Sequence, residues 1–299
     1  MSQDNPFLHI KSRSIILWVI LSIPALFLGS VLIGVLWGLI TLFNDLEFDA
    51  SFSKDPLFIL IVSNTWIYSL MIFWCLRQIK RSHLSIKRII GKLPNNRQWL
   101  GLLCLVVPIL LFSLGSGQMI YYLLSYVAPK IIETSLQQKL FLSSSETSLP
   151  LLYNSLTIIS LVVIAPLVEE ILFRGIILQR WAVKWGLTPA VIISSLVFGV
   201  LHFNLIGLSV FGIMMALLYI KIRTLIIPII CHALNNSAVV IFSLLPIIFN
   251  SKETVYTIEQ VQSSWSVGIF YLVISAPLLI LFIYKNWPNK HDCAPYFTN

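Results

Sequence analysis

The chain has 299 residues, of which 58% are hydrophobic and 11% are charged, and its formal net charge is +8. Such a composition is far more apolar than that of a soluble domain and excludes that class. The basic residues concentrate between apolar segments, so their excess indicates membrane topology and not a nucleic-acid partner.

Apolar segments long enough to cross about 30 Å of hydrocarbon follow one another along the chain. We predict eight helices, the fifth and sixth being short, over residues 15–43, 57–76, 99–127, 150–180, 189–203, 207–222, 225–249 and 264–284. The expected fold class is therefore all-α, a polytopic membrane helix bundle in contact with the lipid bilayer. The loops are too short to fold alone, so we expect one integral membrane domain over residues 1–299.

The loops differ in charge. From Arg77 to Arg97, both included, there are seven Lys or Arg and no acid, whereas 44–56 is acidic and 250–263 is slightly acidic. The positive-inside rule therefore places the 77–97 loop and both termini in the cytoplasm, with the protein in the cell membrane. Lys87 and Arg88 are also candidates for contact with anionic headgroups, although topology alone explains their charge.

Ionisable side chains inside the predicted membrane helices are few. Tyrosines and cysteines aside, they are Glu169, Glu170, Arg174, His202 and His232. Since each of these groups is costly to insert into a bilayer, we expect them to converge on one polar cavity inside the bundle.

Helical spacing divides the two glutamates by role. Glu170 and Arg174 are four residues apart on one helical face, where an ion pair can form, so Glu170 is predicted to be an orienting residue. Glu169 is turned about 100° away and is the better candidate for a general base. Pro166, one turn earlier, should loosen the helix and free backbone carbonyls, and Gly175 permits the close approach of another helix.

Two further pairs repeat the four-residue interval. Phe198 precedes His202, so its ring is expected to wall one side of the imidazole, and His202 can hold an attacking water. His232 and Asn236 share a face and can donate hydrogen bonds to one oxyanion. These groups suffice for an amide hydrolase that activates water.

In chain order these residues form three motifs. They are Glu169-Glu170-x-x-x-Arg174, Phe198-x-x-x-His202 and His232-x-x-x-Asn236. Over about 165–236 the chain resembles the CPBP intramembrane proteases, the Abi family of CAAX prenyl proteases and bacteriocin-processing enzymes. The resemblance implies that Glu169 and His202 activate the hydrolytic water and that His232 and Asn236 form the oxyanion hole.

The resemblance also implies an endopeptidase that cleaves a membrane-associated peptide or protein, with a protease core at about 150–250. The family has been described as metalloproteases, and a zinc ion held by Glu169, His202 and His232 is one possibility. A glutamate-dependent mechanism fits the same residues and requires no cofactor. Two other functions stay open: a catalytically silent immunity or scaffold protein, and a proton-coupled transporter.

Overall fold

The computed structural model describes residues 5–18, 20–21, 31, 35, 38–39, 55–202, 204–249, 257–289 and 292–297. Over these ranges the chain forms helices and no β-strand, which confirms the predicted all-α class. The predicted first helix, 15–43, lies largely outside the described residues.

Six of the described helices are long and apolar enough to cross a membrane. They are α2 (Pro56–Arg81), η3 with α4 (Arg97–Val127), the continuous helix from α6 to α8 (Pro150–Trp185), α10 (Leu205–Ile222), α11 (Ile226–Ile248) and α13 (Trp265–Asn286). The predicted segment 189–203 forms only the 14-residue helix α9, Leu187–Val200. Its length of about 21 Å is shorter than a hydrocarbon core of about 30 Å. The protein is therefore a polytopic helical membrane protein, and the number of eight spans stays a prediction.

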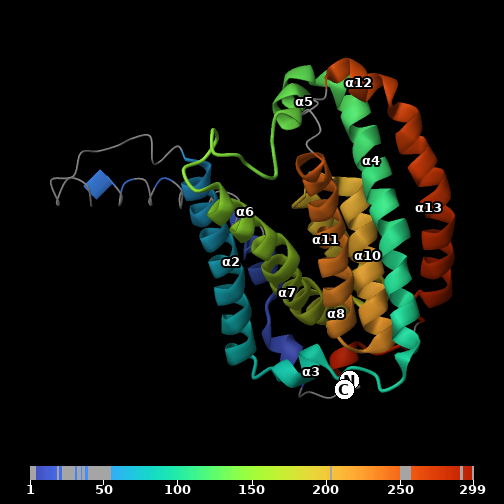
Figure 1. Cartoon of the computed structure of the whole chain (residues 1–299). Coiled ribbons are helices and arrows are strands. Elements are labelled where there is room, and N and C mark those ends of the chain that lie inside the picture. Colours follow the sequence, from blue (N-terminus) through green and yellow to red (C-terminus); the bar gives the residue numbers. More distant parts are fainter. Residues whose placement is uncertain are drawn as a thin grey trace.

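Short elements lie at the two ends of the bundle (Figure 1). At one end are α5 (Pro129–Leu136) and α12 (Ile258–Ser263), and at the other are η1 (Pro6–His9), α3 (Ile86–Ile90) and η6 (Pro295–Phe297). We call the second the basic end, because it carries the 77–97 loop.

Contacts between distant segments hold the basic end together. The Phe7 and Tyr296 rings pack edge-on with centroids 5.0 Å apart, which joins the two terminal segments. The Ile90 carbonyl accepts the Leu225 N–H at 2.8 Å, which ties α3 to the turn between α10 and α11. The basic loop and the two described terminal segments therefore share one side, and their cytoplasmic orientation stays a prediction.

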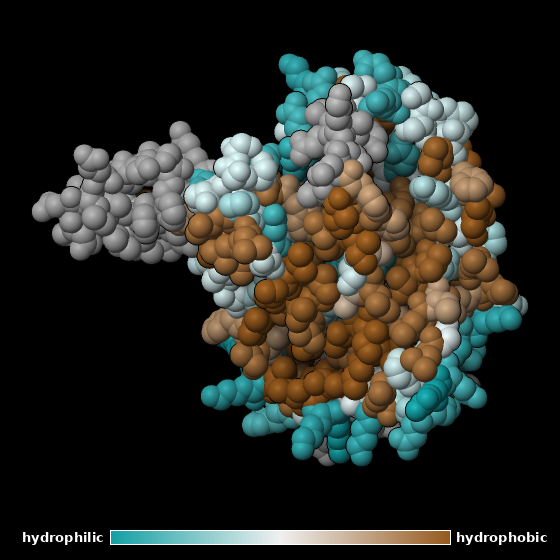
Figure 2. Space-filling model, in the orientation of Figure 1, coloured by the Kyte–Doolittle hydropathy of each residue, from teal (hydrophilic) through white to brown (hydrophobic). Residues whose placement is uncertain are grey.

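The middle of the bundle is covered by apolar side chains. Figure 2 shows a hydrophobic band across this face, with hydrophilic residues gathered along the edge below it. Inside the band α10 is the most enclosed membrane-length helix, with 56% of its apolar window buried. Gly212 lets it approach α9, since a Cβ there would lie 2.9 Å from the Cα of Ser195.

The helix from Pro150 to Trp185, called the long helix below, is interrupted by two π-helical stretches. Its segments are α6 (Pro150–Ile159), the π-helical η4 (Ser160–Ile164), α7 (Ala165–Glu170), the π-helical η5 (Ile171–Leu178) and α8 (Gln179–Trp185). Pro166 has no N–H to donate to the preceding turn, and η4 lies directly before α7. The predicted loosening at Pro166 is confirmed, and π-helical turns are often found at functional sites.

Candidate active site

Glu170 is completely enclosed and makes its polar contacts through one oxygen, Oε1, while the buried Oε2 has no hydrogen-bond partner among the described residues. Its Oε1 accepts a hydrogen bond from Arg174 at 3.0 Å and lies 2.9 Å from Nδ1 of His232. The side chain of Glu170 is 0% exposed and that of Arg174 only 3%. The ion pair predicted from the i, i+4 spacing is therefore present, and it also holds an imidazole from α11.

Arg174 extends this contact to two further helices, α9 and α10. Its second terminal nitrogen donates to the Gly212 carbonyl of α10 at 3.1 Å, and its guanidinium carbon lies 4.8 Å from the centroid of the Phe198 ring. A planar guanidinium offers several donors in a fixed geometry, so these contacts define its orientation. Arg174 thereby links the long helix to α9, α10 and α11.

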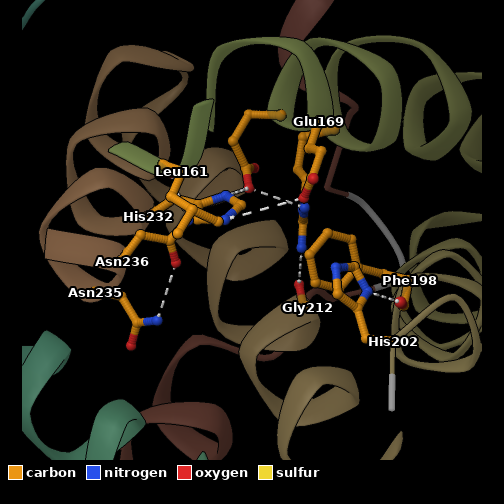
Figure 3. Close-up of polar contacts among 10 residues, drawn as sticks. Leu161, Glu169, Phe198, His202, Gly212, His232, Asn235 and Asn236 are labelled. Atoms are coloured by element: carbon orange, nitrogen blue, oxygen red, sulfur yellow. Dashed lines mark hydrogen bonds and ion pairs between the residues drawn. The ribbon is translucent and has the colours of Figure 1, made fainter. Parts of the chain in front are cut away.

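Glu169 has a different environment from its neighbour. Its side chain is 15% exposed, and its closest charged contact is Nε2 of His232, 3.9 Å from Oε2. The His232 ring therefore lies between the two glutamates, with Nδ1 toward Glu170 and Nε2 toward Glu169 (Figure 3). Glu169 keeps the accessibility that a general base needs, whereas Glu170 does not.

His202 is fixed by its own helix. Its Nδ1 lies 2.6 Å from the Phe198 carbonyl, and its ring centroid is 4.5 Å from that of Phe198. A carbonyl oxygen only accepts, so Nδ1 carries the proton and Nε2 of the neutral ring is left as an acceptor. The predicted wall of Phe198 is confirmed. No direct hydrogen bond joins His202 to Glu169 among the described residues, so a water between them stays a prediction.

Asn236 uses a carbonyl that the long helix leaves free. Its Nδ2 donates to the Leu161 oxygen at 2.8 Å. In a π-helical turn the carbonyl of one residue accepts from the N–H five residues later, which for Leu161 is residue 166. Residue 166 is a proline without an N–H, so the Leu161 carbonyl has no backbone partner there. One amide hydrogen of Asn236 is then left for another acceptor. The neighbouring Asn235 donates weakly to Asn236 at 3.5 Å, so Asn236 is the better placed of the two amides.

Two predictions for the site are a common polar cavity and a set of zinc ligands. Among the described residues, one cavity of about 1310 Å³ lies at the basic end and another of about 130 Å³ lies beside α3. None of the predicted site residues lines either, so a polar cavity around them stays a prediction. In the described part of the chain, no three His, Cys, Asp or Glu side chains are grouped to hold a metal ion. As arranged, Glu169, His202 and His232 do not fit a three-ligand zinc site, and no chemical step below passes through a metal.

Sequence reasoning missed some contacts of the site. The Phe211 ring packs edge-on against His232 with centroids 4.8 Å apart, and the Gly212 carbonyl accepts from Arg174. Both belong to α10, which carries no ionisable residue in its interior, so no charge signalled its role. The direct contact between Glu170 and His232 was also not specified, because the expected convergence of the ionisable groups does not say which of them pair.

Comparison with known proteins shows what the segment that contains this site is similar to. Residues 151–238 match the family model of the type II CAAX prenyl endopeptidase Rce1-like proteins. This segment contains all three motifs. The resemblance to the CAAX proteases is thus confirmed for residues 151–238.

Individual relatives agree with the family match. YdiL of Bacillus subtilis (strain 168) is 36% identical over 88 residues, covering 28% of this chain and 36% of YdiL. CAAX prenyl protease 2 of Homo sapiens is 36% identical over 97 residues, 25% of this chain and 30% of that protein. The membrane-embedded CAAX protease MroQ of Staphylococcus aureus (strain USA300) is 38% identical over 92 residues, 28% of this chain and 37% of MroQ.

The similarity is confined to part of each protein. The chain spans about a third of the length of the curated relatives it matches. No solved structure matches the chain significantly.

Proposed function

We propose that the protein is an intramembrane endopeptidase that hydrolyses a peptide bond in a membrane-associated protein or peptide. The observation that carries this proposal is the unequal pair of acids. Glu170 is closed off by Arg174 and His232, whereas Glu169 beside it keeps 15% of its side chain exposed. An acid retained inside a membrane helix and left accessible is a functional group by default.

Glu169 acts as the general base in this mechanism. It takes a proton from a water molecule whose second hydrogen points to Nε2 of His202, and the water oxygen forms a bond to the scissile carbonyl carbon. The carbonyl electron pair moves onto oxygen. When the carbon–nitrogen bond breaks, Glu169 gives its proton to the leaving amine, so the base is restored.

His232 and Asn236 stabilise the oxyanion. The Nδ1 of His232 faces Glu170, so donation to an oxyanion must come from Nε2, which requires a proton on both ring nitrogens. The remaining hydrogen of Asn236 supplies a second donor, and removal of one such donor typically costs about 10²–10³ in rate.

Glu170 and Arg174 are positioning residues in this account. They hold the His232 ring in place and keep water from its Nδ1 side, and neither touches the substrate. A side chain whose rotamer is fixed by buried partners has lost its rotational freedom before the substrate binds, so binding does not have to order it.

The substrate is proposed only as a class. The substrate is a protein that is bound to the membrane by its own sequence or by a prenyl group. Its scissile peptide bond lies near the membrane and meets Glu169 inside the helix bundle. We also propose the cell membrane, with the basic end in the cytoplasm, as the site of action.

The test compares membranes that contain wild type or Glu169→Gln at equal abundance, scored by mass spectrometry for new peptide termini. Termini that require Glu169 are expected, with a fall of about 10²–10⁴ in their rate of formation. Glu133→Gln is the matched control, because Glu133 is exposed on α5, away from the site. Identical termini with and without Glu169 would leave the immunity or scaffold function.

A chelator distinguishes the two water-activating mechanisms. Purified wild type is expected to keep its cleavage rate after dialysis against a zinc chelator, because Glu169 removes the proton itself. Loss of activity that added zinc restores would contradict the metal-free mechanism and assign Glu169, His202 and His232 as ligands.

A further inference from the structure

A small apolar cavity opens beside the acid pair, on the outside of the bundle. It has a volume of about 130 Å³ and is lined by hydrocarbon side chains and Cys75. Most of its wall comes from α2 and α3, through Ile72, Leu76, Ile79, Ile86, Ile89 and Ile90. Ile72, Leu76 and Ile86 are exposed, so the cavity opens toward surrounding lipid. Apolar cavities of about 150 Å³ stay dry and bind hydrocarbon.

Two exposed lysines directly follow lining residues of this cavity in the chain, Lys80 after Ile79 and Lys87 after Ile86. Lys80 continues the row of Ile72 and Leu76 at intervals of four residues, so it lies on the same face of α2, at the level of the lining residue Ile79. Lys87 follows Ile86 directly on α3 and is exposed. Within the described residues neither lysine takes part in an ion pair, and no acid occurs between Arg77 and Arg97.

The wall formed by α3 is a fixed part of the structure. The Ile89 carbonyl accepts from the Tyr219 hydroxyl at 2.8 Å, and the Ile90 carbonyl accepts from Thr224 Oγ1 at 2.8 Å. Ile89 also fits against Gly175, where a Cβ would lie 2.7 Å from its Cγ2. The cavity is therefore preformed, which reduces the ordering cost of binding.

The cavity and its neighbouring lysines match the two parts of an anionic phospholipid. The hydrocarbon wall suits an acyl chain, and the lysines suit the negatively charged phosphate. We propose that this cavity, between α2, α3 and the long helix, binds one anionic phospholipid, with an acyl chain against Leu76 and Ile86 and the phosphate at Lys80 and Lys87. Basic pockets between membrane helices commonly bind such headgroups on the positively charged side. The choice of a charged lipid rests on charge complementarity, since a neutral lipid would satisfy the cavity but not the lysines.

The cavity also touches the catalytic segment. Val168 and Ile171 form its inner wall, and these residues flank Glu169 and Glu170 directly. A bound acyl chain would therefore fill space behind the acid pair. The lipid site is independent of whether the protein cleaves peptides, so its test uses binding alone.

The test is native mass spectrometry of the full chain in detergent, titrated with phosphatidylglycerol or with phosphatidylcholine of identical acyl chains. Wild type is expected to prefer phosphatidylglycerol by about 25-fold, since each of the two lysines contributes about fivefold near an anionic phosphate. Lys80→Gln and Lys87→Gln should each reduce that preference about fivefold, and the double variant should abolish it. Lys130→Gln, on α5 at the opposite end, is the control and should leave it unchanged.

The chain-binding half is tested separately. Leu76→Phe narrows the cavity without changing charge and should weaken both lipids, while glycerol 3-phosphate, a headgroup without chains, should not displace phosphatidylglycerol. Equal binding of the two lipids by wild type would overturn the proposal. So would a preference that survives in the double lysine variant, or displacement by glycerol 3-phosphate, which would indicate a site for free phosphate. Thermal unfolding of each variant verifies that it is folded.

Discussion

The long helix and α13 are both membrane-length helices that contain an internal proline, yet they are built differently. Pro166 in the long helix follows a π-helical turn, whereas α13 runs as one α-helix from Trp265 to Asn286 through Pro277. In the long helix 39% of the most apolar window is buried, against 22% in α13. A proline alone therefore does not mark a site.

The neighbours of the two helices explain the difference. α13 packs closely on α4, where a Cβ at Gly115 would lie 2.7 Å from the Gly268 carbonyl. The long helix instead meets polar groups of its neighbours. Among them is Asn236, whose side chain donates a hydrogen bond to the Leu161 carbonyl. A freed backbone group becomes part of a site when a side chain of another helix satisfies it.

The largest expected effect on stability is at Arg174. Arg174→Ala leaves Glu170 with a buried charge whose remaining partner is His232, and breaking a buried pair costs about 3–5 kcal/mol. The loss should appear as a lower midpoint of unfolding in detergent. Lys285→Ala in the last turn of α13 is the control and should change stability by less than about 0.5 kcal/mol, because this lysine is exposed. Equal midpoints for the two variants would contradict a structural role for the ion pair.

Asn236 tests the link between the proline and the site. Asn236→Ala leaves the Leu161 carbonyl without its side-chain donor and should cost about 1–3 kcal/mol. Adding Pro166→Ala restores a backbone N–H to the helix and should recover part of that loss, whereas Pro277→Ala should not. A double-mutant cycle measures the coupling. Strictly additive effects of Asn236→Ala and Pro166→Ala would mean that the two residues do not share this carbonyl.

Gly175 tests the fit of the long helix on α3. In Gly175→Ala the new Cβ would lie 2.7 Å from Ile89 Cγ2, and overpacking of this kind costs about 1–3 kcal/mol. Gly101→Ala is the matched control, since no atom lies within 4 Å of its added Cβ. Ile89→Ala in the Gly175→Ala background should relieve the clash. Unfolding midpoints of the three variants decide whether this contact is as close as described.

The smallest effect concerns Asp55 at the start of α2. Hydrogen bonds from Thr147 Oγ1 at 2.7 Å and from the N–H groups of Ser148 and Leu57 lower the pKa of Asp55 below that of a free carboxyl group. A lowered pKa in the folded state adds stability above the unfolded pKa of about 3.9, and this contribution is lost as the pH falls. Wild type should therefore lose more thermal stability than Asp55→Asn between pH 7 and pH 3. Parallel pH profiles for the two proteins would contradict this assignment.

The sequence predicts the parts of the site that lie on one helix. The Glu170–Arg174 pair, the Phe198 wall beside His202 and the loosening at Pro166 each follow from spacings within a single helix, and the structure has all three. The all-α class and the extents of most helices follow from hydropathy in the same way.

Which side chains pair between helices could not be predicted, although the convergence of the ionisable groups was expected. That His232 lies between two glutamates and that Asn236 pairs with Leu161 depends on the rotation and depth of α11 against the long helix. Helical period gives the face of a residue but not the neighbour that the face meets. The contact of α3 with Gly175 could not be predicted for the same reason, because the residues of α3 were interpreted only as part of a basic loop.

The central claim is that two adjacent glutamates have different roles, and it is tested most directly by measuring cleavage and unfolding for Glu169→Gln and Glu170→Gln side by side. Glu169→Gln should form the peptide termini seen with wild type at a rate lower by about 10²–10⁴, while its unfolding midpoint stays at the wild-type value. Glu170→Gln should lose stability, because it removes the charge that Arg174 and His232 share. Cleavage that persists in Glu169→Gln, or an equal loss of stability in both variants, would contradict the account.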